Sequence, residues 1–550
     1  MKKILSLAAI VLFCYSISAQ ISHGGKPYSF TNDGLKSDIE HRKIAPPDVE
    51  RLIMEDLVNE SKSVPYRIGV LLEAKINPDN SGTWDELNNG YKLWRIHLSS
   101  DGAQALNLYF DDFFLPQGAK LFVYSTDKNQ VIGSFTEFNN HESRLFATQY
   151  ITGNEIIVEL YLPLNATNYT LNISDIGYAY RETGNIYETK DISCMVNVKC
   201  PEGNNWQNQK QGVARTKIVI GSYQYMCSGS LANNTNDNCA PYFLSAQHCF
   251  DDATATNFNQ MIFYFNYEAS TCAGTIGPQT QTVIGAQLKA SSPTFTSFNG
   301  TNSDMSLLLL NNNVPQTYNP YFSGWSRATT ASPSGVGIHH PDGNIKKIST
   351  YTSTLTNYYT THWQVIWAST VTNHSVTYVG SSGSPIFNNN GLIVGTLSTG
   401  ASACDNLTGP DQYGKFSFHW QSNGTTTNRQ LKPWLDPVGS NPTTLQGTSY
   451  ATCDSSQSIE YNKSGKNQFD MIEIHPNPTS DIATIKFNFK QNESSQIYVY
   501  DLMGKMVMKA ESNMMSDEFT ISAKELKAGL YNIVVFNNNE IYTRKLSVIR

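Results

Sequence analysis

The chain has 550 residues, which at roughly 150 residues per domain leaves room for several domains. Charged residues make up only 15% of it and the net charge is −7, which argues against a basic nucleic-acid-binding face. With 11% aromatic residues, and with 37 glycines and 22 prolines spread along the chain, the composition favours short strands and turns. We therefore expect a mainly β protein.

The first residues predict a secretory signal over residues 1–19. Two lysines precede an apolar run from Ile4 to about Tyr15, and the small residue Ala19 lies where a signal peptidase would cut. The run is shorter than the roughly twenty apolar residues of a transmembrane helix, and no other segment is predicted to span a membrane. The sequence thus predicts an exported protein.

The cysteines indicate disulfides in one part of an exported chain. Of the nine cysteines, only Cys14 lies in the leader, and its apolar surroundings argue against a lipoprotein. An even number in the remainder is typical of a disulfide framework. No pair has the spacing of a zinc knuckle, so no metal site is predicted. The cysteines after the leader are Cys194, Cys200, Cys227, Cys239, Cys249, Cys272, Cys404 and Cys453.

The patterns after the leader divide the chain into four segments. Residues 20–190 lack cysteine, and from about Tyr66 to Pro163 they alternate β-rich runs with turn clusters, which predicts a β-sandwich. Residues 191–447 carry short strands and one short terminal helix in the stretch RQLKPWLDP. Residues 448–470 have little apolar content and are expected to be a linker. Residues 471–550 alternate apolar and polar residues, which predicts a small β-sandwich.

The last segment also carries a more specific pattern. It has Pro476-Asn477-Pro478 after its first strand, a DLMGK turn, the triplet GLY and a basic final strand. The segment resembles the C-terminal sorting domain of type IX secretion. That resemblance implies export across the outer membrane, with the type IX machinery as a partner and the domain usually removed on the way.

Three segments of the cysteine-bearing module carry candidate catalytic residues. In YFLSAQHC a strand-like run leads to His248, in NSDMSLLLL Asp304 opens an apolar run, and in GSSGSPIF Ser382 lies among glycines. Taken singly, each has a structural explanation: a histidine beside a disulfide, a turn aspartate and a Gly/Ser turn. Together they follow the order His, Asp, Ser of the chymotrypsin-like arrangement. We therefore expect Ser382 to be the nucleophile, His248 the base and Asp304 the group that orients it.

The glycines beside Ser382 suggest how the reaction's negative charge would be stabilised. Backbone N–H groups of Gly380 and Ser382 are the expected oxyanion hole, because glycine lets the chain approach a substrate carbonyl closely. No nucleotide motif, phosphate loop or metal cluster is found, so no cofactor is predicted.

The module resembles the bacterial lysyl endopeptidase family over residues 194–445. The stretches CSGSLANNTNDNCAPYFLSAQHC, IHHPDGNIKKIS, GSSGSPIF and GPDQYGKF carry the resemblance. It implies a chymotrypsin-like double β-barrel that cleaves protein substrates after lysine. It also implies three disulfides, and the two remaining cysteines are expected to pair with each other. The implied pairs are Cys194 with Cys404, Cys200 with Cys272 and Cys227 with Cys249, leaving Cys239 for Cys453.

The resemblance assigns lysine recognition to Asp411. The position six residues before Ser382, where trypsin-like enzymes carry the pocket acid, is Val376. A buried substrate ammonium needs a counter-charge, so the pocket role is favoured over a turn aspartate. Ser398 replaces a histidine that supports the family's pocket, which leaves the strictness for lysine over arginine open. His339 and His340 match the family pattern and are expected to be structural.

The precursor is expected to be kept inactive by its first domain. Ser381 replaces the aspartate that receives a new N-terminus in trypsin, so another switch is needed. We expect residues 20–190 to be an inhibitory or chaperoning propeptide, cut after Lys190 to leave Asp191 as the mature N-terminus. Two other functions stay open at this point: a secreted adhesive protein with an inactive protease-like module, and a secreted esterase.

Overall fold

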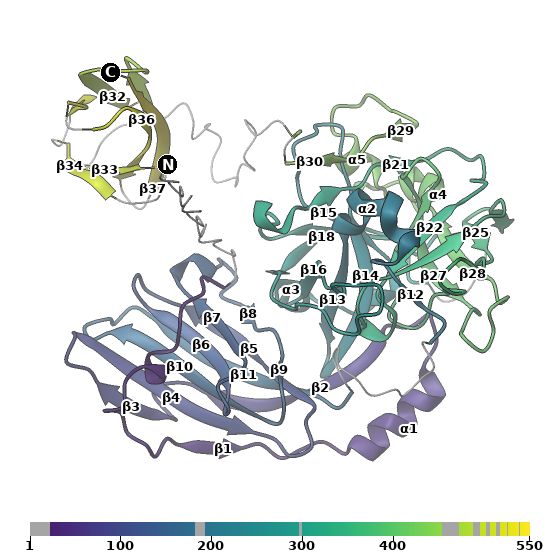
Figure 1. Cartoon of the computed structure of the whole chain (residues 1–550), viewed down its shortest axis with the longest axis horizontal. Coiled ribbons are helices and arrows are strands. Elements are labelled where there is room, and N and C mark those ends of the chain that lie inside the picture. The colour runs from purple at the N-terminus through teal and green to yellow at the C-terminus, as the bar shows by residue number, and fades with distance from the viewer. Residues whose placement is uncertain are drawn as a thin grey trace, which may run out of the picture. The chain divides into compact units, whose positions relative to one another are not determined.

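The structure of the chain is a computed structural model (Figure 1). The chain forms two compact units, which divide between Ser456 and Gln457. The expected leader, Lys190 and Asp191 lie outside the described residues. None of the described helices combines the length and apolar character that a membrane crossing requires. The described residues are 22–181, 193–295, 300–450, 452–453, 472–487, 495–501, 506–512, 518–524, 526–537 and 540–549.

The first part of the larger unit is a pair of stacked sheets. In strand β10 (Glu155–Pro163) every second residue from Ile156 to Leu162 is fully buried, and this two-residue repeat is typical of a strand with one face in a core. One sheet contains β1 (His41–Lys43), β3 (Thr83–Glu86), β4 (Tyr91–Ser99), β6 (Lys120–Ser125), β7 (Val131–Phe135) and β10 (Glu155–Pro163). The other contains β2 (Tyr66–Ile76), β5 (Ala105–Phe114), β8 (Phe146–Ala147), β9 (Ile151–Thr152) and β11 (Thr170–Ala179).

Helix α1 (Val49–Asn59) leads into β2. The Asp48 side chain accepts a hydrogen bond from the Arg51 N–H at 3.0 Å and so caps the helix. Four residues of β2 then pair antiparallel with β14 (Tyr223–Leu231), with Tyr66 opposite Met226 and Val70 opposite Tyr223. The first domain and the cysteine-bearing module therefore share one continuous sheet, which the sequence pattern did not predict.

Two β-barrels make up the cysteine-bearing module. In the first, the buried side chains of Phe243, Phe263 and Leu308 meet in the interior. Its strands are β13 (Val213–Ile220), β14, β15 (Tyr242–Ser245), β16 (Ile262–Phe265), β17 (Thr282–Ile284), β18 (Ala286–Ser291) and β19 (Ser306–Leu310). The second contains β12 (Val196–Asn197), β21 (Trp325–Ser326), β22 (Gly335–His339), β23 (Lys347–Tyr351), β24 (Thr356–Tyr358), β25 (His362–Val365), β26 (Pro385–Asn388), β27 (Ile393–Gly400), β28 (Asp411–Lys415) and β29 (Thr444–Leu445).

Short helices punctuate the barrels, and one more strand follows the boundary expected at 447. Strand β30 (Thr448–Ser449) pairs with β20 (Tyr321–Phe322), so residues assigned to the linker belong to the module. The short terminal helix predicted in RQLKPWLDP is α5. The α-helices here are α2 (Gln207–Gly212), α3 (Ala255–Asn259), α4 (Phe416–Gln421) and α5 (Lys432–Leu435). The 3-10 helices of this unit are Tyr28–Phe30, Glu137–Asn139, Pro201–Trp206, His248–Phe250, Gln316–Tyr318, Pro341–Gly343 and Thr427–Arg429.

The C-terminal unit is a small β-sandwich. Ile485 from one sheet and Ile497 and Ile533 from the other share its apolar core. The first sheet contains β31 (Ile472–His475), β32 (Ile482–Phe487) and β35 (Glu518–Ser522). The second contains β33 (Gln496–Asp501), β34 (Met506–Glu511), β36 (Gly529–Asn537) and β37 (Glu540–Val548). The whole described chain is thus mainly β, as composition predicted.

Candidate active site

His248 and Asp304 meet because the strands beside them pair. Ser245, at the end of β15, lies opposite Ser306, at the start of β19. The His248 Nδ1 atom lies 2.7 Å from Asp304 Oδ2, and the His248 backbone N–H donates to Asp304 Oδ1 at 2.9 Å. Both side chains are buried. The Asp304 carboxylate therefore holds His248 through both its ring and its backbone N–H.

Ser398 completes the surroundings of Asp304. Its hydroxyl donates to Asp304 Oδ2 at 2.5 Å. Burial raises the pKa of Asp304, but the His248 charge and the hydrogen bonds from His248 and Ser398 outweigh it, so the pKa lies below its ordinary value. Sequence reasoning linked Ser398 to the lysine pocket, whereas its hydroxyl acts on the aspartate beside the imidazole.

The turn that carries Ser382 depends on two glycines. Gly380 and Gly383 have φ values of +81° and +79°, the left-handed region that favours glycine. A Cβ at Gly383 would clash with the Ser245 hydroxyl and the Ser228 backbone. Ser228 also binds the turn directly, since its N–H donates to the Ser382 carbonyl at 2.8 Å and its hydroxyl to the Gly380 carbonyl at 3.0 Å. Two hydrogen bonds from Ser228 of β14 thus hold the turn in place.

The expected oxyanion donors are present in this turn. Within the described residues, no hydrogen bond is recorded from the N–H of Gly380 or of Ser382. The Ser382 hydroxyl donates to the backbone carbonyl oxygen of Lys62 at 3.0 Å. Over the same residues, no hydrogen bond between Ser382 Oγ and His248 Nε2 is recorded. The hydroxyl of Ser382 is thus engaged by the first domain.

Asp411 lies at the start of β28 and is fully buried. Its Oδ2 atom accepts hydrogen bonds from three neutral donors: Trp367 Nε1 at 2.7 Å, Thr377 Oγ1 at 2.6 Å and Ser402 Oγ at 2.7 Å. The position expected from trypsin, Val376, is buried and apolar, and its neighbour Thr377 supplies a hydroxyl instead. The carboxylate is therefore held by fixed groups of the second barrel.

A lysine of the first domain occupies the space in front of Asp411. Lys62 Nζ lies 2.9 Å from Asp411 Oδ1, 2.6 Å from the Ser402 carbonyl oxygen and 2.8 Å from Ser402 Oγ. Its side chain is 5% exposed. Burial raises the pKa of Asp411, but the Lys62 charge and the three neutral donors bring it below its ordinary value. Sequence reasoning missed Lys62, because no motif surrounds it.

The two histidines expected to be structural lie beneath the Ser382 turn. His339 Nδ1 lies 2.8 Å from Ser381 Oγ, and its Nε2 lies 3.0 Å from Ser349 Oγ. Burial, followed by the neighbouring Lys62 charge, lowers the pKa of His339 to about 3, so the ring is neutral at ordinary pH. His340 Nδ1 lies 2.9 Å from the Asn344 carbonyl oxygen. The His339 ring thus holds the side chain beside the nucleophile, and the His340 ring holds the turn that follows β22.

The structure brings together the four expected cysteine pairs. Their Cα–Cα distances lie within the range that a disulfide bridges. The bridge between Cys227 and Cys249 ties β14 to the residue after His248. The distances are 5.5 Å for Cys194–Cys404, 4.4 Å for Cys200–Cys272, 6.4 Å for Cys227–Cys249 and 5.9 Å for Cys239–Cys453.

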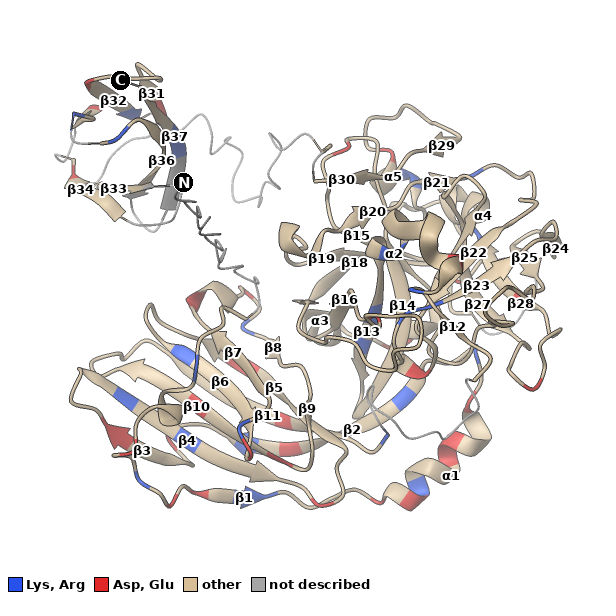
Figure 2. Ribbon diagram, in the orientation of Figure 1, with Lys and Arg blue, Asp and Glu red and all other residues tan. Residues whose placement is uncertain are grey.

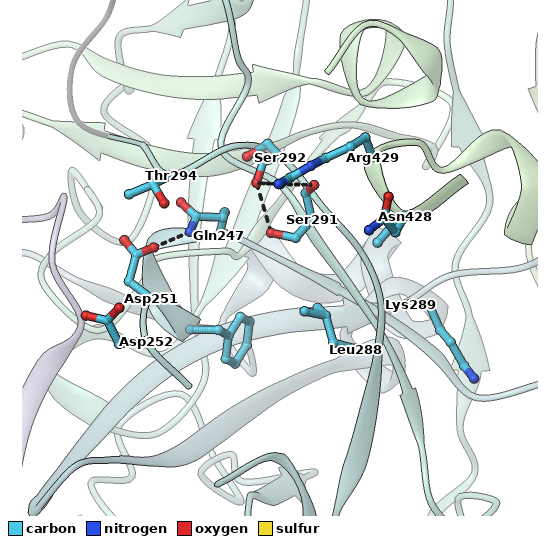
Figure 3. Close-up of a pocket in the computed structure, with 12 residues that line it drawn as sticks. Gln247, Asp251, Asp252, Leu288, Lys289, Ser291, Ser292, Thr294, Asn428 and Arg429 are labelled. Carbon is cyan, nitrogen blue, oxygen red and sulfur yellow. Dashed lines mark hydrogen bonds between the residues drawn. The ribbon is translucent and has the colours of Figure 1, made fainter. Parts of the chain in front are cut away.

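A cavity of about 340 Å³ opens beside the residue that precedes His248 (Figure 3). Gln247 donates to Asp251 on one side of it, and Arg429 donates to the carbonyl oxygens of Ser291 and Ser292 on the other. Its lining includes neither the pocket around Asp411 nor any of His248, Asp304 and Ser382. The cavity is therefore separate from the candidate active site.

The two-barrel fold and the comparisons with known proteins together define the class as a serine endopeptidase of the chymotrypsin-like type. The N-terminal domain model of lysyl endopeptidase matches residues 46–177, and the C-terminal domain model matches residues 189–414. The chain belongs to the lysyl endopeptidase family. Residues 473–549 match the secretion system C-terminal sorting domain, which directs export through type IX secretion to the cell surface or the extracellular space.

Individual relatives are distant. A lysyl endopeptidase of Pseudomonas aeruginosa is 27% identical over 328 residues, which cover 56% of this chain and 68% of that protein. Among solved structures, a thermostable serine protease from an extremophilic microorganism is 15% identical with a TM-score of 0.30, covering 40% of this chain and 98% of its own. The protease Anisep from Arthrobacter nicotinovorans is 17% identical with a TM-score of 0.28, covering 37% and 90%.

Proposed function

We propose that this secreted serine endopeptidase cleaves peptide bonds after lysine, using His248, Asp304 and Ser382 as its triad. The observation that carries the proposal is the ammonium of Lys62 against Asp411, with the carbonyl oxygen of the same residue against Ser382. A lysine side chain thus spans the distance from the pocket acid to the nucleophile. A substrate cut after lysine must span the same distance, with its ammonium in the pocket and its backbone carbonyl beside the nucleophile.

The proposed roles follow from the contacts. Ser382 Oγ attacks the substrate carbonyl carbon while His248 Nε2 takes its proton and later returns it to the leaving amine. Asp304 keeps the Nδ1–H of His248 pointed inward and stabilises the imidazolium. The N–H groups of Gly380 and Ser382, which have no recorded partner in the described part of the chain, are free to receive the oxyanion. Water then hydrolyses the acyl-enzyme by the same steps.

The pocket's shape favours lysine over arginine. The groups around Lys62 Nζ, namely Asp411 Oδ1 with the carbonyl and hydroxyl of Ser402, form a compact cup at 2.6 to 2.9 Å. An ammonium is a compact charge with three donors, which matches such a cup. A guanidinium is longer and planar, and its five donors need a fork of acceptors. We therefore infer much weaker cleavage after arginine.

Complete digestion of an unfolded protein by the purified, processed enzyme tests this specificity. Mass spectrometry of every cleavage product should place nearly all cuts after lysine. Cuts spread over uncharged residues would overturn the pocket assignment. A lysine ester should also be hydrolysed much faster than a simple acetate ester. The reverse order would favour the esterase, and no turnover of any substrate would favour the inactive adhesive module.

The domain roles complete the proposal. We propose a signal over residues 1–19, a propeptide over 20–190, the protease from 191, and a sorting domain over 471–550 that engages the type IX machinery. The pairing of β30 with β20 and the contact between Cys453 and Cys239 support an end of the protease module beyond residue 447.

Processing after Lys190 would leave Asp191 as the new N-terminus. N-terminal sequencing tests it: the Ser382→Ala precursor, made without other proteases, should keep its propeptide. Normal processing of that variant would overturn self-cleavage.

A further inference from the structure

The segment that delivers Lys62 is anchored on both sides. Asp56, near the end of α1, lies 2.7 Å from Arg67 Nε and 2.8 Å from Arg181 Nη2. Glu60 lies 2.9 Å from Arg181 Nη1. All of these side chains are at most 15% exposed. Helix α1 carries red and blue bands in Figure 2, and its Asp56 joins Glu60 in a partly buried ion network that fixes the chain two residues before Lys62.

After Lys62 the chain is held by backbone pairing. Tyr66, Arg67, Gly69 and Val70 of β2 lie opposite residues of β14. Strand β14 runs on into Cys227 and Ser228, and Ser228 binds the turn of Ser382. Because β14 contacts both the first domain and the nucleophile turn, a fixed register of β2 on β14 also fixes where Lys62 lies relative to Ser382.

The backbone at Lys62 forms a turn. The Val64 N–H donates to the Ser61 carbonyl oxygen at 3.2 Å, and the hydroxyls of Ser61 and Ser63 lie 3.1 Å apart. The Lys62 carbonyl oxygen accepts from the Ser382 hydroxyl, and within the described residues it has no recorded bond from the N–H of Gly380. Attack would need that oxygen in the oxyanion hole and the Ser382 proton directed to His248. The contact thus binds the lysine without aligning it for cleavage.

We propose that Lys62 is an internal blocking residue: the first domain inhibits its own protease by filling the lysine pocket with this side chain while the Lys62–Ser63 bond stays intact. The proposal rests on the proposed function, since it requires Asp411 to be the pocket that substrate lysines use. It names one residue, far from the expected cut after Lys190, as the source of latency. It also predicts that the block is lost when the side chain changes, even while the chain remains whole.

The test uses the full chain carrying Ser382→Ala, which removes the proposed nucleophile. Fluorescence anisotropy measures binding of a labelled hexapeptide with a single lysine, and of its norleucine counterpart. Adding Lys62→Met should strengthen binding of the lysine peptide at least tenfold over the parent. Lys62→Gln should strengthen binding in the same way. This second variant is included in case the methionine variant folds poorly, because its polar amide can still donate to the Ser402 carbonyl oxygen. Lys43→Met, at a lysine whose side chain is 59% exposed, is the matched control and should bind like the parent.

The outcomes separate the two proposals. If the processed wild-type enzyme cuts lysine peptides in preference to norleucine peptides, but the folded Lys62→Met and Lys62→Gln chains bind no better than the parent, the blocking role is refuted and the specificity stands. If the processed enzyme shows no preference for lysine, the proposed function itself fails. A gain equal to that of Lys62→Met in the Lys43→Met control would also refute a specific role for Lys62.

Discussion

Asp411 and Glu268 are two acids that each bind lysine, Asp411 through Lys62 and Glu268 through Lys199 and Lys210, but their surroundings differ. Both oxygens of Asp411 are occupied, and the groups on Oδ2 are neutral donors of the barrel itself. Glu268 Oε1 lies 3.0 Å from the ammonium groups of both Lys199 and Lys210, while its Oε2 has no hydrogen-bond partner among the described residues. One carboxylate is preorganised by dipoles, and the other is neutralised by charges from its own module.

The difference is the one expected between the proposed lysine-binding site and a structural ion cluster. An acid held by neutral donors keeps its place when its lysine is exchanged, because those donors continue to stabilise the charge. An acid held by lysines of the same module has no exchangeable partner. Removing one member leaves buried charge unpaired, which destabilises the fold. Asp411 is thus suited to exchange one lysine for another, and Glu268 is suited to hold strands together.

The largest expected effect concerns the proposed triad, which carries out the chemistry beside the Asp411 pocket. Ser382→Ala should lower kcat by on the order of 10⁶-fold, because it removes one part of a unit acting together. His248→Ala should cost a comparable factor, and Asp304→Asn on the order of 10⁴-fold. Steady-state kinetics with a lysine peptide measure the decrease in kcat, and circular dichroism checks that each variant is folded. Near-normal turnover by the Ser382→Ala enzyme would refute the mechanism.

Removing the pocket charge should damage specificity selectively. Asp411→Asn leaves a substrate ammonium without its counter-charge, so kcat/KM on lysine peptides should fall by on the order of 10² to 10³-fold, matching about 3 to 4 kcal/mol. Norleucine peptides should be cut as before, since they place no charge in the pocket. Parallel kinetics on the two peptides give the ratio. An equal loss on both would remove Asp411 from lysine recognition.

The corresponding acid-to-amide substitution at Glu268 should act on stability instead. Glu268→Gln leaves Lys199 and Lys210 close together without their carboxylate, and the free energy of unfolding should fall by roughly 3 kcal/mol. The ratio of lysine to norleucine cleavage should not change. Urea titration measures the first quantity and peptide kinetics the second. A changed ratio with unchanged stability would contradict the distinction drawn between the two sites.

A smaller effect is expected beside the imidazole. Ser398→Ala removes the hydrogen bond to Asp304 while keeping the His248 contact, and kcat should fall by about tenfold, or about 1.4 kcal/mol. KM for lysine peptides should stay the same. If KM rose and kcat did not change, Ser398 would belong to the pocket, as its place in the sequence suggested. Steady-state kinetics distinguish the two.

The smallest effect concerns pH and the Glu268 cluster. Burial lowers the pKa of Lys346 to about 8, and its Nζ donates to the Lys210 carbonyl at 2.6 Å. Between pH 7 and 9 the folded state loses this proton while the unfolded chain keeps it, so stability should rise with pH, by about 1 kcal/mol. Urea midpoints across this range should show a shallower rise in Lys346→Met. An unchanged slope would exclude Lys346 as the titrating group.

Short sequence patterns were enough to predict those residues of the candidate site that lie in recognisable strand ends and turns. His248, Asp304 and Ser382 each stand at a strand end or a glycine turn, where residue type and spacing carry information. Lys62 is a single lysine after a short helix, and its partner Asp411 lies 349 positions further on. Ser398 resembles any polar residue of an alternating strand, and only the fold aims its hydroxyl at Asp304. Pairings set by tertiary register escaped sequence reasoning.

The antiparallel pairing of β2 with β14 has a consequence for what a cut would achieve. Breaking the chain between residues 181 and 193 leaves those backbone hydrogen bonds and the Lys62–Asp411 pair in place. Before the cut, the linker holds the first domain at a millimolar effective concentration near the protease. After the cut, binding of the first domain depends on its actual concentration in solution. Dilution, more than the broken bond, would then govern how quickly the active site clears.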